Sequence, residues 1–586
     1  MKFLLTALNA KYIHSNPAIY SLRAYAGKEY EEHIAIAEYT INHRVENILA
    51  DIYKSSPDVI GFSCYIWNFG MIREIITELR KILPSVPIWL GGPEVSYDAE
   101  KLIEECPAVT GIMVGEGEKT FLELLQYYIE NTGSSGEQKL AEIAGIVFRG
   151  MDHIVTTRER APMDMSTLPF LYENLEDFKN RIIYYETSRG CPYRCSYCLS
   201  SVDKKVRLRN AEIVKRELQF FLDRRVTQVK FVDRTFNCNH GHAMAIWQYI
   251  HEHDNQVTNF HFEIAAEIIK EEELLLLSRM RPGLVQLEIG VQSTNPQTLK
   301  AIDRFMDMDK LRSIVSRIHE GKNVHMHLDL IAGLPYEDYN SFGRSFDEVY
   351  AMRPHQLQLG FLKVLKGSPM YARAGSYGIN YTDAPPYEVL YSKWLPYDKI
   401  CELKRIEEMT ELYYNSNQFT HTLPVLEKAF ESPFSMYEKL AMYYEEKGYF
   451  VNSPSRIYRY EVLLGFACFY DKDKEELYRE LLTYDIYLRE NMKSRPAFAK
   501  DMKEAKAEAQ SFYKREEQVR KLLPAYEEYQ LRQIAKMTHM EVFSYPVWEE
   551  EADKRMIRAG NARAILFDYR KRSPLTNEAS VLLISG

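Results

Sequence analysis

The sequence lacks any apolar run as long as the ~18 residues that a membrane-spanning helix needs, so we expect no membrane-embedded part. Its opening letters, MKFLLTALNAKYIHSNP, hold only a very short apolar stretch and no small-residue cleavage site, which predicts a cytoplasmic protein without a secretory signal. Basic residues are not in excess either, since 74 Lys and Arg stand against 83 Asp and Glu. The net charge of −9 argues against a protein that mainly coats nucleic acid, although it leaves room for a local basic groove.

Cysteine is scarce, with eight in 586 residues, and only Cys191, Cys195 and Cys198 lie close together. Such a cluster in a cytosolic protein indicates metal binding or catalysis rather than a disulfide framework. A structural zinc ion usually takes four ligands in two close pairs, and no second pair accompanies the triplet. His240 and His242 are the candidates for completing a zinc site, but they lie far along the chain. Zinc is therefore the minor alternative.

Nucleotide-binding glycine motifs are also missing from the amino-terminal region. No G-x-G-x-x-G and no G-x-x-x-x-G-K-S/T follows the first predicted strand, which excludes dinucleotide and triphosphate sites there. The first ~130 residues nevertheless alternate strand-like runs with amphipathic segments such as 70–83. This alternation predicts a parallel sheet wrapped by helices, with ligands at the carboxyl ends of the strands. The strands are expected at 2–8, 58–64, 86–90 and 111–114.

A second alternating series begins near residue 182, after a polar Gly/Ser segment and a short β connector over 141–165. Six β/α units predict a partial barrel with its chemistry at the carboxyl ends of the strands. The strands are expected at 182–188, 228–233, 259–265, 284–291, 325–331 and 356–364.

Beyond residue 385 the sequence is rich in Glu, Lys, Tyr and Leu, which predicts helices over 400–535 and a terminal hairpin from 564–569 and 579–584. The fold class is therefore α/β, with three domains and one connector. We assign a Rossmann-like domain to 1–132, a connector to 133–180, a partial (β/α)6 barrel to 181–384 and a mostly helical carboxyl-terminal domain to 385–586.

The cysteine triplet has the spacing C-x3-C-x2-C, directly after a predicted strand, within the segment ETSRGCPYRCSYC at 186–198. A 4Fe-4S cluster is usually held by four thiolates, so three cysteines leave one iron open. An open iron can chelate the amino and carboxylate groups of S-adenosylmethionine (SAM). Electron transfer into the sulfonium can then cleave a carbon–sulfur bond. The triplet thus predicts a 4Fe-4S site for radical chemistry, with Cys191, Cys195 and Cys198 as its ligands.

In this setting the triplet resembles the radical SAM superfamily. The segment LEIGVQS at 287–293 resembles the fourth strand of members similar to oxygen-independent coproporphyrinogen oxidase, and DLIAGLP at 329–335 resembles their fifth-strand glycine motif. The resemblance implies that Tyr197 packs near the adenine of SAM. It also implies that the SAM ribose or methionine lies near Gln292 and Ser293, and that the backbone approaches the cofactor at Gly333.

Acidic residues at two predicted strand ends are further candidates for the SAM pocket. Asp233 ends the second strand of the barrel series, where related enzymes often carry an acidic pair, and Arg234 departs from that pattern. Glu263 and Glu267 flank the end of the third strand, and a simple salt bridge is the competing interpretation for either.

The amino-terminal region resembles the cobalamin-binding domain fused ahead of many radical SAM enzymes. The resemblance implies that 65–69, beginning with Tyr65, lies beside the corrin. The D-x-H-x-x-G motif that supplies a histidine to cobalt in many cobalamin proteins is absent, and His14 in the first loop is the candidate axial ligand, with simple hydrogen bonding as the alternative. A domain that has lost cobalamin is a second alternative. Room for the corrin and its tail is expected at Gly91, Gly92, Gly115 and Gly117.

Taken as a whole, the chain resembles cobalamin-binding radical SAM proteins that end in an uncharacterised helical domain. The resemblance implies three cofactors: a 4Fe-4S cluster, SAM and cobalamin. It implies reductive cleavage of SAM to a 5′-deoxyadenosyl radical, hydrogen abstraction from substrate, and methyl transfer to an unactivated carbon. It further implies a small-molecule or peptide substrate and an external low-potential electron donor of the flavodoxin or ferredoxin type. The carboxyl-terminal domain is expected to cap the barrel mouth.

Three alternatives remain at this point. One is a radical rearrangement or ring-forming reaction, and another is coproporphyrinogen oxidase-like chemistry without cobalamin. The third is a cobalamin- or redox-sensing protein without SAM turnover, although we recognise no output module in the sequence. No nucleic-acid-binding module is recognisable, and the sequence indicates neither the substrate nor an individual catalytic side chain.

Overall fold

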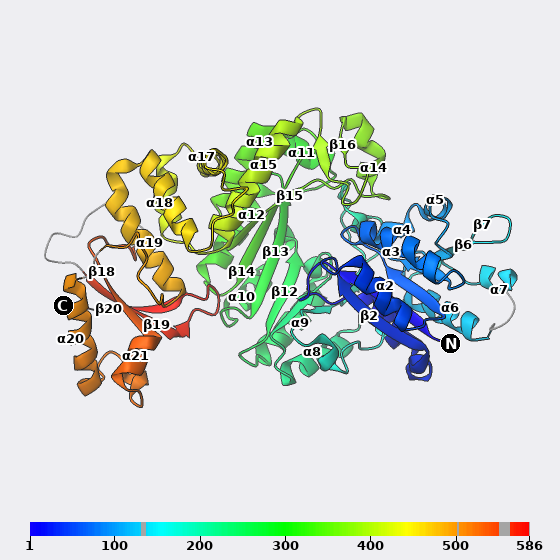
Figure 1. The fold of residues 1–586 in the computed structure, drawn as a ribbon, viewed down its shortest axis with the longest axis horizontal. Coiled ribbons are helices and arrows are strands. Elements are labelled where there is room, and N and C mark those ends of the chain that lie inside the picture. The colour runs from blue at the N-terminus through cyan, green and yellow to red at the C-terminus, as the bar shows by residue number, and fades with distance from the viewer. Residues whose placement is uncertain (131–135, 501–502, 550–562, 585–586) are drawn as a thin grey trace.

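The computed structural model describes residues 1–130, 136–500, 503–549 and 563–584 (Figure 1). The amino-terminal domain lies at one end of the molecule, the barrel in the middle, and the carboxyl-terminal domain at the other end. Within the described ranges, no helix is both long and apolar enough to cross a membrane.

The amino-terminal domain is a sheet of seven strands in the order β2-β1-β3-β4-β5-β6-β7. The four predicted strands are confirmed as parallel neighbours, and β2 joins them at the sheet edge. The bounds are β1 (Phe3–Asn9), β2 (Ile34–Thr40), β3 (Val59–Ser63), β4 (Ile88–Gly91), β5 (Gly111–Met113), β6 (Ile146–Arg149) and β7 (Ile154–Thr156). Because β6 and β7 pair antiparallel onto β5, the sheet extends into the segment predicted to be a connector.

Helices cover both faces of this sheet because the strands alternate their apolar side chains between two cores. Phe3, Leu5 and Ala7 of β1 join one core, while Leu4 and Leu8 join the other. On the second face, α3 buries residues at helical spacing, namely Ile72, Ile75, Ile76 and Leu79. The helices are α1 (Pro17–Ala26), α2 (Val45–Lys54), α3 (Phe69–Ile82), α4 (Pro93–Ser96), α5 (Ala99–Glu105), α6 (Glu118–Glu130) and α7 (Glu137–Ala141).

The barrel is a six-stranded parallel sheet whose neighbours follow chain order, β8-β11-β12-β13-β14-β15. All six predicted strands are confirmed. Their bounds are β8 (Ile183–Tyr185), β11 (Gln228–Phe231), β12 (Asn259–Ile264), β13 (Val285–Gln292), β14 (His325–Ala332) and β15 (Gln356–Phe361). The intervening helices are α8 (Ala211–Asp223), α9 (His240–Glu252), α10 (Glu271–Ser278), α11 (Pro296–Ala301), α12 (Met308–Glu320) and α13 (Tyr339–Tyr350).

The two faces of the barrel strands differ in polarity. Along β13 and β14, fully buried apolar residues alternate with half-buried polar ones. The apolar set packs beneath the helices, and the polar set, including Glu288 and His327, faces the inside of the open barrel. Polar groups therefore line the space into which the carboxyl ends of the strands open.

The carboxyl-terminal domain packs on the flank of the barrel formed by β15 and α13. Its main helices are α15 (Tyr397–Met409), α17 (Pro433–Glu446), α18 (Tyr458–Tyr470), α19 (Glu475–Arg489), α20 (Lys503–Val519) and α21 (Leu531–Met537). The predicted terminal hairpin is confirmed, and a third antiparallel strand extends it. These strands are β18 (Thr538–Phe543), β19 (Arg563–Arg572) and β20 (Ala579–Ile584).

The expectation that this domain caps the barrel mouth holds only for its first segment. A Cβ added at Gly333, beside the carboxyl end of β14, would lie 2.6 Å from Cγ1 of Val389. The terminal sheet approaches the opposite end, because a Cβ added at Gly283, just before β13, would lie 2.9 Å from the Pro574 carbonyl oxygen. Most of the domain therefore packs against the side and the amino-terminal end of the barrel.

Candidate functional site

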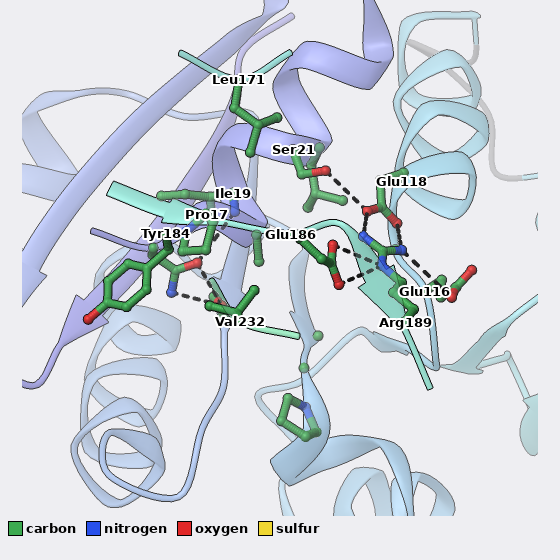
Figure 2. Close-up of a pocket in the computed structure, with 18 of the residues that line it drawn as sticks. Pro17, Ile19, Ser21, Glu116, Glu118, Leu171, Tyr184, Glu186, Arg189 and Val232 are labelled. Atoms are coloured by element: carbon green, nitrogen blue, oxygen red, sulfur yellow. Dashed lines mark hydrogen bonds and ion pairs between the residues drawn. The ribbon is translucent and has the colours of Figure 1, made fainter. Parts of the chain in front are cut away.

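A cavity of about 810 Å³ lies between the first sheet and the barrel (Figure 2). Segments that follow β1, β3, β4 and β5 form one wall, and segments at the ends of β8 and β11 form the other. Carboxyl ends of parallel strands from two sheets thus face one space, as expected for ligand sites in such sheets. All six residues predicted for a corrin site line it: His14, Tyr65, Gly91, Gly92, Gly115 and Gly117.

The four glycines differ in what surrounds them. Gly115 has a φ of +80°, and no atom lies within 4 Å of a Cβ built there, so its backbone borders open space. A Cβ at Gly92 would lie 2.4 Å from the Cys64 carbonyl oxygen, so this glycine permits close packing of the chain itself. A Cβ at Gly91 would make an ordinary contact with Met113 Cε at 3.5 Å, and one at Gly117 a tighter contact with Leu22 Cδ2 at 3.1 Å. Gly115 is thus the position where a flat ligand can meet bare backbone.

An aromatic pair forms another part of the wall. Tyr65 and Trp67 stack with ring centroids 4.3 Å apart and an interplanar angle of 10°. Their loop is fixed by Asn68, whose amide donates to the carbonyl oxygens of Leu8 and Ser63 and whose carbonyl accepts from the Tyr65 amide. The pair presents a rigid apolar surface to the cavity.

His14 bridges the two domains within the cavity wall. Its Nδ1 lies 2.5 Å from the Tyr184 hydroxyl of β8. Burial, followed by the nearby Lys11 charge, lowers the pKa of His14, so the imidazole is neutral near pH 7. This hydrogen bond uses one ring nitrogen and leaves Nε2 for another partner.

The cysteine triplet follows a short strand, β9 (Ser188–Arg189), on a loop anchored from several sides. Cys191 and Cys195 are buried and Cys198 is half-buried. The Cys191 amide donates to the Asp203 carbonyl oxygen, and the Ser196 amide donates to that of Ile302. Three thiols within eight residues give the donor set of a cluster with one open iron. Among the residues that the structure describes, however, no three Cys, His, Asp or Glu side chains form a group that could hold a metal ion.

The zinc alternative gains no further ligand from the neighbouring histidines. His242 contacts the Thr187 hydroxyl through Nε2 at 3.1 Å. His240 lies between Glu272 and Glu273, at 2.6 Å and 3.0 Å. Both imidazoles are thus engaged with other groups.

Three residues predicted to contact SAM have protein partners in this structure, and their contact with SAM stays a prediction. Asp233 is fully buried, and its carboxylate accepts from the backbone amide and the hydroxyl of Thr187 rather than lining the cavity. The buried Ser293 hydroxyl donates to Glu337 at 2.6 Å. Gly333 is covered by Val389, so its φ of +86° serves a turn packed against protein. Each of these three contacts joins the end of a barrel strand to a segment distant in sequence.

The other predicted residues face the inside of the barrel or the cysteine loop. Gln292 is half-buried at a β-bulge and has a φ of +72°, an uncommon strain that often accompanies functional sites. Burial and the nearby Glu288 carboxylate raise the pKa of Glu263 to about 7. Tyr197 is half-buried, and burial raises the pKa of its phenol.

Sequence reasoning missed two residues of this region. Arg304 contacts Cys195 Sγ through Nη1 at 3.6 Å, donates through Nη2 to the Gly290 carbonyl oxygen, and has a buried Nε with no partner among the described residues. Asp329 is half-buried, its buried Oδ1 likewise has no partner among the described residues, and burial raises the pKa of its carboxyl group well above the usual range. Asp329 begins the motif used to select Gly333, whereas only the fold shows the position of Arg304.

Below these groups, histidines form a row inside the barrel. Ring centroids of His355 and His325 lie 4.7 Å apart, those of His325 and His327 5.1 Å, and those of His327 and His261 5.8 Å. Burial lowers the pKa of His325 and His327 to about 4 and that of His355 to about 3. The row is therefore neutral near pH 7.

We expect His325 and His327 to make the fold sensitive to acid. The folded state keeps both imidazoles neutral down to about pH 4, whereas the unfolded chain protonates them near pH 6.5. The free energy of unfolding should therefore fall as the pH drops from 6.5 towards 4, by about 2 kcal/mol per histidine. Urea unfolding of the protein without cofactors at pH 7 and pH 4.5 measures this loss, which should be smaller in the variant His325→Gln/His327→Gln.

Wild type and variant must be compared, because buried carboxyl groups change the free energy of unfolding with pH in the opposite direction. Asp233, Glu263 and Glu337, each with a pKa raised to about 7 by burial, add stability on acidification in both proteins. An equal loss of unfolding free energy in wild type and variant would contradict the prediction.

Three sequence families match consecutive parts of the chain. Residues 4–125 match the family described as "B12 binding domain", residues 185–349 match "Radical SAM superfamily", and residues 375–567 match "Protein of unknown function (DUF4080)". The matched segments follow the order of the first sheet, the barrel and the carboxyl-terminal domain.

Curated relatives and a solved structure extend the likeness. The chain is similar to the cobalamin-dependent radical SAM methyltransferase TokK of Streptomyces tokunonensis, with 28% identity over 375 residues, 60% of this chain and 53% of that protein. It is similar to 2-(S-pantetheinyl)-carbapenam-3-carboxylate methyltransferase of Streptantibioticus cattleyicolor, with 25% identity over 365 residues, 58% of this chain and 50% of that protein. The chain thus spans about half the length of these relatives.

The structural similarity concerns the fold. The cobalamin-dependent S-adenosylmethionine radical enzyme OxsB, with aqua-cobalamin bound, superimposes with a TM-score of 0.54 and 16% identity, covering 82% of this chain and 80% of that chain. A sheet domain joined to a partial barrel is therefore an arrangement that this chain shares with a solved structure.

Proposed function

Because the chain joins a B12 binding domain to a radical SAM domain, it belongs to the cobalamin-binding radical SAM family, and we propose that it is a cobalamin-dependent radical SAM methyltransferase. It would transfer a methyl group to an unactivated carbon of a small molecule or peptide. The observation that carries the proposal is the 810 Å³ cavity, because strand ends of both domains and the residues just before the cysteine triplet face the same space.

The cavity has features that a corrin requires. Gly115 offers bare backbone, and the Tyr65–Trp67 pair offers a flat apolar wall. A second cavity of about 640 Å³ shares Ser96, Tyr97 and Gly115 with the first, so a corrin at Gly115 could extend its nucleotide tail there. These residues would hold cobalamin, which would supply the methyl group when bound.

The cluster and SAM would be held on the barrel side. Cys191, Cys195 and Cys198 are the thiolates proposed for the iron, on the anchored loop after β9. The unpartnered Arg304 Nε suits a carboxylate, and the unpartnered Asp329 Oδ1 suits a hydroxyl or amine donor. When bound, the cluster and SAM would supply a 5′-deoxyadenosyl radical, and cobalamin would supply the methyl group.

The chain's own residues would orient these groups and exclude water from them. Asp233 fixes the chain at Thr187, four residues before Cys191, by two hydrogen bonds. The cavity wall shared by two domains limits access to the reactive centre. Because SAM cleavage consumes an electron, we also propose an external low-potential donor of the flavodoxin or ferredoxin type.

Reconstitution with known cofactors tests the proposal without knowledge of the substrate. The chain is loaded anaerobically with iron, sulfide and hydroxocobalamin, then given titanium(III) citrate and SAM. We expect slow release of both 5′-deoxyadenosine and S-adenosylhomocysteine. Release of 5′-deoxyadenosine by a chain that binds no cobalamin would favour coproporphyrinogen oxidase-like chemistry, and cofactor binding without SAM turnover would favour a sensor.

We expect cobalamin to bind without a protein imidazole on cobalt, because the D-x-H-x-x-G motif is absent. His14 is the residue to test, since its contact with Tyr184 uses Nδ1 and leaves Nε2 available. Electron paramagnetic resonance of the Co(II) form measures this, since a nitrogen ligand splits each cobalt line into a triplet. The spectrum should show no such splitting and should be unchanged in His14→Ala. Splitting that disappears in His14→Ala would identify His14 as the ligand and contradict this prediction.

A further inference from the structure

Arg189 occupies a junction between the cavity and the cysteine loop. It ends β9, two residues before Cys191, and its side chain lines the cavity while remaining only 17% exposed. Figure 2 shows its guanidinium group between three carboxylates. Nη2 lies 2.5 Å from Glu118 Oε1, Nε lies 3.0 Å from Glu186 Oε1, and Nη1 lies 3.7 Å from Glu116 Oε1.

Two of these carboxylates belong to the other domain. Glu116 lies between Gly115 and Gly117 in the loop after β5, at the edge of the proposed corrin site, and Glu118 is the first residue of α6. The Glu118 side chain is 5% exposed, begins α6, and accepts from the Ser21 hydroxyl of α1. Glu116 and Glu118 at the cavity wall therefore bind Arg189, the residue after which the cysteine loop begins.

A second arginine repeats the link on the other side of that loop. Arg207, in β10 (Arg207–Leu208), lies 2.6 Å from Glu116 Oε1 and 2.8 Å from Asp203 Oδ2. Asp203 accepts in turn from the Cys191 amide through its carbonyl oxygen, at 2.9 Å. Both ends of the cysteine loop are thus tied to Glu116 of the amino-terminal domain, and the Arg189 end is tied to Glu118 as well.

A buried arginine fork suits a positioning role better than a merely stabilising one. Exposed ion pairs contribute little to stability, and buried ones often gain little net free energy because both charges lose water. The planar guanidinium nevertheless fixes distance and direction through several hydrogen bonds at once. This contact joins the two domains at the place where the two proposed cofactor sites meet. It therefore fixes the distance between those sites.

We propose that Arg189 is a positioning residue that sets the distance between cobalamin and the SAM-binding cluster. This inference rests on the proposed function. In methyl transfer from SAM to reduced cobalamin, the sulfonium carbon–sulfur bond breaks, its electron pair stays on sulfur, and the methyl carbon bonds to the electron pair of cobalt. Such a displacement requires in-line approach, so a small error in spacing lowers its rate strongly.

The experiment compares Arg189→Met and Arg189→Lys with the control Arg281→Met. Arg281 makes a comparable ion pair within the barrel, at 2.8 Å to Asp254, and is 18% exposed. With iron, sulfide, hydroxocobalamin, titanium(III) citrate and SAM, Arg189→Met should keep its iron and cobalamin but form S-adenosylhomocysteine about tenfold more slowly. Pulsed electron paramagnetic resonance should show a broadened cobalt–cluster distance, and Arg189→Lys should recover part of both. Arg281→Met should match wild type.

Normal S-adenosylhomocysteine formation and an unbroadened distance in Arg189→Met would overturn the inference. If this variant does not fold, Glu118→Gln, which weakens the same contact from the other side, replaces it with the same expected outcomes. A second measurement uses the protein without cofactors, where amide hydrogen exchange should rise in both 115–118 and 190–203 of Arg189→Met but not of Arg281→Met. Unchanged exchange in Arg189→Met would contradict the positioning role, whether or not the wild type forms S-adenosylhomocysteine. Failure of the wild type to form S-adenosylhomocysteine would reject the proposed function instead.

Discussion

Anaerobically reconstituted protein is expected to carry about four irons and four sulfides per chain and to lose them when Cys191, Cys195 or Cys198 is replaced by alanine. The loss should be essentially complete, because a cluster that already has one iron without a cysteine would be left with only two thiolates. Iron and sulfide analysis with the absorbance of the cluster measures it. Full iron content in the triple variant would contradict the assignment.

The remaining cysteines provide graded controls. Cys401 and Cys468 lie on α15 and α18 in the carboxyl-terminal domain, and their alanine variants should retain full iron. Cys238 is the more stringent control, because the Cys191 thiol is close enough to contribute to the raised pKa of Cys238, about 11, after burial. Retention of iron in Cys238→Ala would show that spacing within the loop, and not mere proximity, selects the ligands. Cys64 and Cys106 are buried in the first domain, and alanine there should affect packing only.

Arg304→Met is expected to lower 5′-deoxyadenosine formation about 100-fold while leaving the iron content near that of wild type. The reason is the buried Nε without a partner, which an anionic group of SAM would satisfy. Loss of a buried charged hydrogen bond costs about 3 kcal/mol, which corresponds to about two powers of ten in rate. The measurement is 5′-deoxyadenosine release with titanium(III) citrate, together with SAM affinity by equilibrium dialysis.

Arg281→Met serves again as the matched control, since its ion pair lies at the other end of the barrel strands. Arg304 also contacts Cys195, so the iron content decides between two roles. If Arg304→Met loses its iron in proportion to its activity, the arginine supports the cluster loop and the prediction for SAM is wrong. SAM affinity unchanged at full iron content would contradict it as well.

The barrel was predictable because its signal is local. Apolar runs recur along the chain, and each of the six strands falls where such a run predicts it. In the first domain, β2 escaped prediction because the alternation of isoleucine and alanine in IAIAEYT does not distinguish a strand from a helix. The pairing of β6 and β7 onto β5 is a contact between segments, which no periodicity reveals.

The site was predictable only as far as it depends on position within a motif. Gly115 and Tyr65 follow strand ends and do line the cavity. For Asp233, Ser293 and Gly333 the motif gave the location, but partners distant in sequence, namely Thr187, Glu337 and Val389, determine what each does. Arg304 and Arg189 likewise contact residues distant in sequence, and only the fold shows those contacts.

The antiparallel pairing of β6 with β5 also sets where the first domain can be cut from the rest. A fragment ending at residue 132 would contain β5 without the strand that covers its open side. The freed amide and carbonyl groups would form a ready template for edge-to-edge association, a common route to insoluble protein. A truncation placed beyond β7, which ends at Thr156, keeps β5 paired on both sides and so leaves this template closed.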